Sequence, residues 1–190
     1  MKNIASRALF AAALLLSLSF ATSAATQTAT LFNHIKHHDY DRASFSFSLG
    51  VPGDSRFPAN RNLYDLSYGS ISLGDGQDYF DVPINDRSYS QLKDLGELKW
   101  DELHDVPVLH ASQWPHGDGL KSDFSRSITG TDPELTPANV VVKALLGHLY
   151  VLHSKHDRTD IYVLFRIETL KLNDECTISW QIVRSPEEIE

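Results

Sequence analysis

Histidine and aspartate side chains, which serve proteins as metal ligands and as acid–base groups, are concentrated in HLYVLHSKHDRTDIYVLFRIE, residues 148–168. Either chemistry needs several such side chains to converge on one point. Side chains alternate along a strand, so His148 and His153, five positions apart, cannot bind one ion unless a bulge intervenes. His153 and His156 flank a turn that is highly charged, as solvated turns are. The stretch is therefore interpreted as a β-hairpin with a charged turn, and not as a metal or catalytic cluster.

A second histidine group, HIKHHDYD at residues 34–41, is the better candidate for a metal site. His34 and His38 share one face whether the segment is a helix or a strand, and Asp39 could add an oxygen ligand. Imidazole suits zinc, copper or nickel. No His-Glu-x-x-His pattern supplies paired ligands with a general base. The sequence offers these three residues as the site of a metal-dependent hydrolase, with a polar lead-in to the next strand as the alternative, and it requires no cofactor.

A nucleophilic serine is a further alternative. The string GDSR at 53–56 resembles the Gly-Asp-Ser block of GDSL-type esterases, and DELH at 101–104 resembles their Asp-x-x-His block. The resemblance implies a serine esterase with Ser55 as its nucleophile, and it covers only these two short strings. The family's Gly-x-Asn-Asp block is absent, and Pro52 and Pro58 bracket the serine where the family has a buried parallel strand. The esterase is therefore the weaker of the two enzyme hypotheses.

A tryptophan in a polar, turn-rich stretch offers a binding function instead. In QWPHGDG at 113–119, Trp114 could stack against a sugar ring while His116 and Asp118 bond its hydroxyl groups. These three residues are the predicted ligand-binding set, and the alternative is that the indole folds back over the edge of a sheet. Two acidic stretches, 74–78 and 117–123, lack the order of an EF-hand and are interpreted as tight turns, with weak calcium binding left open.

The N-terminus has the layout of a secretory signal peptide. Lys2 and Arg7 precede an apolar run over 8–20, and small residues at 22–25 supply a cleavage site after Ala24 or Ala25. The run is too short to span a bilayer, no later segment is long and apolar enough to do so, and no cysteine follows it to carry a lipid. We expect an exported protein, periplasmic or extracellular. The absence of an Asn-x-Ser/Thr sequon is compatible with a bacterial source.

Charge and cysteine content limit the partners. The 190 residues carry a formal net charge of −8, and removal of 1–25 takes away Lys2 and Arg7 but no acid, which makes it −10. Such a surface repels phosphate backbones and anionic lipids, so nucleic acids and membrane surfaces are disfavoured as partners. The single cysteine, Cys176, cannot form an internal disulfide. Stability must come from the core, a metal or a partner.

The elements that would position these residues are mostly strands. Apolar and polar residues alternate over 43–49, 160–168 and 176–183, and strands are also expected over 63–73, 79–84, 140–144 and 148–153. The last four strands of the chain are joined by connections too short for crossovers, so we expect them to be antiparallel. One or two short helices are allowed within 88–105, and 112–137 is interpreted as a loop region. The predicted fold is all-β, either an antiparallel sandwich or an open barrel-like sheet.

This pattern divides the chain into a signal peptide (1–25), a lead-in segment (26–42), one β-rich domain (43–184) and an acidic tail (185–190). The side chains expected to face the core are Phe45, Phe47, Ile161, Val163, Phe165, Ile167, Cys176, Ile178, Trp180 and Ile182. Long loops bearing Trp, Pro and Gly on a rigid β-scaffold suit recognition. The sequence thus favours a non-catalytic exported binding module for a polysaccharide or an envelope protein over either enzyme.

Overall fold

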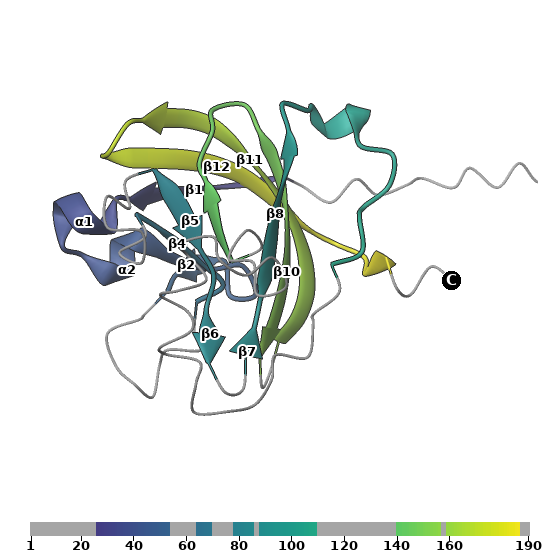
Figure 1. The fold of residues 1–190 in the computed structure, drawn as a ribbon, viewed down its shortest axis with the longest axis horizontal. Helices are drawn as coiled ribbons and strands as arrows, with labels where there is room; N and C mark the ends of the chain where they lie inside the picture. Colours follow the sequence, from purple (N-terminus) through teal and green to yellow (C-terminus); the bar gives the residue numbers. More distant parts are fainter. Residues whose placement is uncertain are drawn as a thin grey trace, which may run out of the picture.

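The computed structural model describes residues 26–53, 64–69, 78–85, 88–109, 140–156 and 159–186, and these form an all-β, sandwich-like fold (Figure 1). Two five-stranded antiparallel sheets make up most of it, and a two-stranded ribbon pairs β6 (Ile84–Asn85) with β7 (Ser88–Tyr89). The predicted fold class is confirmed. The signal peptide expected at 1–25 lies outside the described residues.

The larger sheet has the order β1-β12-β11-β10-β8. Its strands are β1 (Gln27–Phe32), β12 (Glu175–Val183), β11 (Thr159–Lys171), β10 (Leu149–His156) and β8 (Gln91–Gly96). β10 and β11 pair antiparallel from Leu149↔Arg166 to His156↔Thr159, so the hairpin interpretation of residues 148–168 is confirmed. The lead-in segment supplies β1, which pairs with the C-terminal strand.

The smaller sheet has the order β3-β2-β4-β5-β9. Its strands are β3 (Val51–Pro52), β2 (Ser44–Ser46), β4 (Leu66–Tyr68), β5 (Tyr79–Asp81) and β9 (Val141–Lys143). β9 pairs with β5 and not with β10. Of the last four strands, which were expected to be antiparallel, the first thus lies in the other sheet, because a turn at Leu146–Gly147 carries the chain from one sheet to the other.

The main core lies between the two sheets and is rich in aromatic side chains. Phe80 of the smaller sheet packs edge-on against Phe165 of the larger, with ring centroids 5.3 Å apart. Of the residues expected to face inward, Val163, Phe165, Ile167, Cys176, Ile178, Trp180, Phe45 and Phe47 are buried in this core, and Ile161 packs against it partly buried. The alternation in β11 and β12 thus identified their core-facing sides correctly.

Ile182 is an exception, since 44% of its surface is exposed. Its strand is flanked by β11 on one side, where Ile182 pairs with Val163. On the other side β1 begins opposite Trp180, so β12 extends past the end of its neighbour. Ile182 thus lies on the same side of the sheet as the buried Val163, but it is not buried as expected, and it lies beyond the end of β1.

Residues 88–105, where one or two short helices were allowed, hold strands as well as one short helix. β8 occupies 91–96, and only a 3₁₀ turn, η2 (Trp100–Glu102), is helical. Residues 97–109, which follow β8, run over the outer face of the larger sheet and form a second, smaller core. We call these residues the covering segment. The members of the second core are Leu109, Val151, Tyr162 and Leu164, with Leu95, Trp100, Leu103, Val106 and Val183 packed against them.

The two short helices precede β2. They are α1 (His34–His37) and α2 (Tyr40–Ala43). The strand expected over 43–49 is confined to 44–46, because residues 47–50 form a turn closed by a bond from the Gly50 N–H to the Ser46 carbonyl, 2.8 Å. Leu49 is consequently exposed.

Candidate functional site

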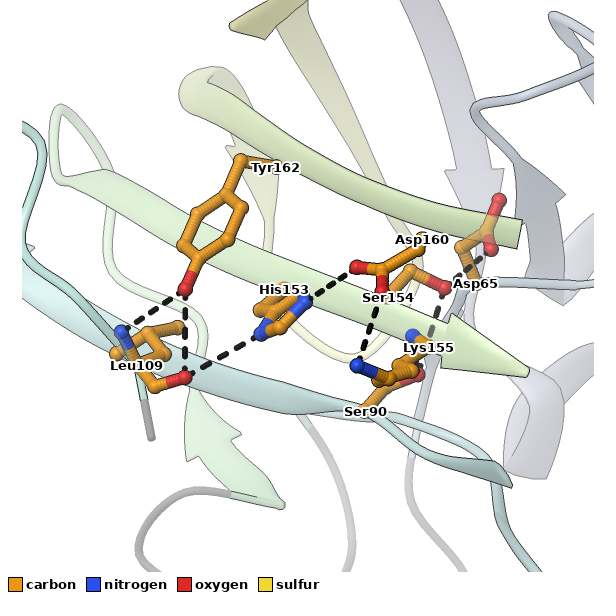
Figure 2. Close-up of polar contacts among 8 residues, drawn as sticks. All are labelled: Asp65, Ser90, Leu109, His153, Ser154, Lys155, Asp160 and Tyr162. Atoms are coloured by element: carbon orange, nitrogen blue, oxygen red, sulfur yellow. Dashed lines mark hydrogen bonds and ion pairs between the residues drawn. The ribbon is translucent and has the colours of Figure 1, made fainter. Parts of the chain in front are cut away.

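His153 lies on the outer face of β10, beneath the segment that covers this sheet (Figure 2). Its side chain is almost fully buried. The Nε2 atom is 2.7 Å from Oδ1 of Asp160 on the neighbouring strand, and the Nδ1 atom is 3.3 Å from the carbonyl oxygen of Leu109. The imidazole therefore joins the hairpin to the covering segment.

Asp160 connects the buried His153 ring to a partly exposed side chain. Its carboxylate also binds the Lys155 ammonium group, with Nζ 2.9 Å from Oδ2, and both side chains are about half exposed. Burial alone would raise the pKa of Asp160, but hydrogen bonds from His153 and Lys155 outweigh it and lower the pKa below its usual value. Asp160 is therefore an anion wherever the protein is near neutral pH.

Tyr162 completes the attachment of Leu109. Its ring stacks on the His153 imidazole, with centroids 4.2 Å apart and planes at 18°. Its hydroxyl accepts a hydrogen bond from the Leu109 N–H at 3.2 Å and donates one to the Leu109 carbonyl at 3.3 Å. Leu109 is thus held through both backbone groups by two adjacent side chains of the sheet. We call His153, Tyr162 and Asp160 the Leu109 anchor.

The residue after His153 points to the opposite face, as strand geometry requires. The Ser154 hydroxyl donates to the buried Asp65 carboxylate at 2.5 Å, and Asp65 in turn accepts the N–H of Phe47 at 2.7 Å. This link joins β10 of the larger sheet to the residue before β4 of the smaller sheet (Figure 2). Because His153 and Ser154 lie on opposite faces, they do not form the nucleophile–base pair that covalent catalysis needs.

The predicted metal ligands lie in and around the two short helices. His34 is buried in α1 and packs on Tyr40, with ring centroids 3.9 Å apart. Burial, and then the nearby charge of His38, lower the pKa of His34. His38 ends α1 in the left-handed conformation, at φ 52°, and its N–H bonds to the His34 carbonyl. Asp39 is the N-cap of α2 and accepts the N–H groups of two residues in its first turn.

Each of these three residues therefore has a local structural role. Within the described ranges, no three or more His, Cys, Asp and Glu side chains are grouped as metal ligands would be. The metal site at His34, His38 and Asp39 stays a prediction.

Their neighbour His37 forms a contact that the sequence did not reveal. Its Nε2 atom is 2.7 Å from Oδ1 of Asp174, in the turn between β11 and β12, and the ammonium groups of Lys36 and Lys171 bind the same carboxylate at 2.8 and 2.5 Å. Hydrogen bonds from Lys171, Lys36 and His37 hold the pKa of Asp174 well below its usual range. From the sequence, the Asn173-Asp174 pair indicated a turn but not the contacts of Asp174 with α1.

The predicted ligand-binding residues, Trp114, His116 and Asp118, lie outside the described residues, as does Ser55. The structure does describe the residues that flank this part of the chain. On one side is Leu109, held by its anchor, and on the other is Val140, whose carbonyl accepts the Val82 N–H at 3.1 Å. Trp114 is the fifth residue after Leu109.

Comparison of the chain with family models, with curated proteins and with solved structures finds no match. Among the helices that the structure describes, none has the length and apolar character to cross a membrane.

Proposed function

We propose that this protein is an exported, non-catalytic binding module that recognises a polysaccharide or an envelope protein. The observation that supports it best is the Leu109 anchor, which fixes the start of the segment carrying Trp114, His116 and Asp118 to the larger sheet. Recognition residues are commonly carried on loops that a rigid β-scaffold positions. A stacking aromatic with neighbouring polar groups suits a sugar ring.

The partners of the described polar side chains favour binding over catalysis. His148 faces the carboxylate of Asp94 at 3.0 Å, and His153 faces that of Asp160. The Ser154 hydroxyl is committed to Asp65. Both ring nitrogens of His153 are engaged within the fold, by Asp160 and by the Leu109 carbonyl, so this imidazole is not free to accept a proton from a substrate. This supports a role in which the sheets act as a scaffold.

A glycan-array screen with the processed protein tests the proposal. We expect binding to one class of polysaccharide that Trp114→Ala weakens about two- to tenfold, because stacking on an aromatic ring contributes about 0.5–1.5 kcal/mol. Trp114→Phe is the matched control, since it keeps an aromatic face and should retain most of the affinity. Equal thermal midpoints for the three proteins would show that the fold is unchanged.

Three outcomes separate the alternatives. Binding that is unchanged in Trp114→Ala would remove this residue from the site. Absence of glycan binding would leave an envelope protein as the ligand, to be sought by crosslinking in the periplasm with the same two variants. Stoichiometric metal in untagged protein, lost in a His34→Ala/His38→Ala variant, would overturn the proposal in favour of the hydrolase.

A further inference from the structure

Both ring nitrogens of His153 face oxygen atoms that accept hydrogen bonds: Oδ1 of Asp160 and the carbonyl oxygen of Leu109. A neutral imidazole has one N–H and one lone pair, so it can satisfy only one of these oxygens, whereas an imidazolium donates to both. We propose that His153 is held as an imidazolium that links Leu109 to Asp160, and that loss of its proton releases the Leu109 side of this link. The link joins described residues only and does not depend on the binding function proposed above.

The two bonds are unequal, and this decides which one is lost. The Nε2 contact with Asp160 is 2.7 Å long and is made to a charged carboxylate, whereas the Nδ1 contact with the neutral carbonyl is 3.3 Å long. Charge-assisted hydrogen bonds are shorter and stronger than neutral ones. The depressed pKa of Asp160 keeps that carboxylate ionised over the range in which a histidine titrates. The remaining proton of a neutral ring therefore stays on Nε2.

Deprotonation then leaves a lone pair on Nδ1 facing the Leu109 carbonyl oxygen. Two acceptors in contact repel each other, so this side of the link changes from attraction to repulsion. Tyr162 continues to bond both backbone groups of Leu109. We therefore expect Leu109 to stay bound to Tyr162 but to be held less tightly, so that the opening of its hydrogen bonds depends on pH.

The polar and titratable groups near His153 come from every element packed around it. They are Asp160 and Tyr162 from β11, Lys155 from β10 and Gln91 opposite it in β8, whereas His104 and Asp105, which precede Leu109, are exposed. Asp160 bonds to the ring directly, and Lys155 shares the same carboxylate. Gln91 is uncharged. The charged groups closest to the ring are therefore the Asp160 carboxylate and the Lys155 ammonium group, which binds the same carboxylate.

Nuclear magnetic resonance of the ¹⁵N-labelled full chain tests the proposal on the wild-type protein. Ring-nitrogen shifts of His153, followed across the pH range in which the protein stays folded, should show both nitrogens protonated at the acidic end and Nδ1 losing its proton first. In the same pH step the protection factor of the Leu109 amide should fall about two- to tenfold, which corresponds to one net hydrogen bond. Protection factors are used because intrinsic amide exchange itself varies with pH.

The fold supplies an internal control. The Leu145 N–H donates to the Tyr150 hydroxyl at 2.8 Å, and that hydroxyl donates to the Lys143 carbonyl at 2.9 Å. This tyrosine–backbone arrangement resembles the one at Leu109 but has no imidazole bonded to its carbonyl among the described residues. The protection factor of Leu145 should stay constant through the step.

Two variants sharpen the test. His153→Phe keeps a ring for stacking on Tyr162 and removes both N–H groups, so Leu109 protection should be low and independent of pH. Asp160→Asn keeps an acceptor oxygen and removes the charge, so the step should move to lower pH.

A His153 ring that is neutral at every pH where the protein is folded would overturn the proposal. So would a ring that titrates while Leu109 protection stays unchanged, and the wild-type titration alone decides this if a variant fails to fold.

Discussion

Trp180 and Phe47 pack edge-on across the main core, with ring centroids 5.2 Å apart and planes at 67°. Trp180 belongs to β12 of the larger sheet, and Phe47 lies in the turn after β2 of the smaller one. Phe45 contacts the same indole from 5.6 Å. The indole therefore joins the two sheets directly, and its burial is a large single contribution to the core.

Replacement of Trp180 by alanine should lower the free energy of unfolding by about 3–5 kcal/mol, through lost burial and a residual cavity. Ile182→Ala is the matched control on the same strand, and it should cost about 1 kcal/mol or less because Ile182 is partly exposed. Urea unfolding monitored by circular dichroism measures both. A loss of stability in Trp180→Ala as small as that in the control would mean that the core-facing side of β12 has been assigned wrongly.

The thiol of Cys176 should be inert in the folded protein. Its side chain is buried in the main core, and desolvation, followed by the negative charge of Asp78, raises the pKa of the thiol far above its usual range. Reaction with a thiol reagent at pH 8 should be at least about a thousandfold slower in native protein than in urea, because only the unfolded fraction reacts. Rapid stoichiometric labelling of the native protein would contradict the buried position.

His34 should contribute a loss of stability as the pH falls below 6.5. Burial, with the charge of His38, lowers the pKa of His34 from 6.5. Below pH 6.5 the unfolded chain binds a proton that the folded protein does not yet bind, so the free energy of unfolding falls until the lower folded pKa is reached. Above pH 6.5 this contribution is fully present.

Urea titrations between about pH 7.5 and 5.5 measure this slope in a range where carboxylates change little. We expect His34→Gln to flatten it. His104→Gln, at an exposed position, should leave it as in the wild type. An equal slope in all three proteins would show that another group is responsible.

Export with cleavage is expected from the N-terminal sequence. Intact-mass measurement of the periplasmic or secreted protein should find it shorter than the full chain by about 24 or 25 residues. A full-length product in the cytoplasm would contradict this expectation.

The sequence predicts well where one strand face is uniformly buried. In β11 the alternation places Val163, Phe165 and Ile167 in the core, because a shift of one residue would expose all of them. It fails at Ile182, since alternation along one strand does not reveal where the neighbouring strand ends.

Short helices were allowed within 88–105 because Leu92, Trp100 and Leu103 fit the spacing of a helix, and this spacing has a different origin. Leu92 is buried in the main core, whereas Trp100 and Leu103 pack in the second core on the opposite face of the sheet. Two cores on opposite sides of one sheet thus produced a periodicity that resembles that of a helix.

Part of the candidate site could have been predicted from the hairpin register. Pairing of Lys155 with Asp160 places His153 diagonally across from the same aspartate, within reach of its side chain. The contact of His153 with Leu109 could not have been predicted, because the two residues are 44 positions apart and Leu109 lies in an irregular segment. The contacts of Asp174 with α1 are equally non-local.

The pairing of β1 with β12 also determines the order in which the protein can fold. Thr30 and Thr177 bond to each other across 147 positions of the chain. β1 is translated before the other described strands and β12 after them, so the larger sheet cannot be completed until residues 175–183 are available. A chain exported in the unfolded state would therefore cross the membrane without this sheet closed, and its final strand would add β1 to the sheet only on the far side.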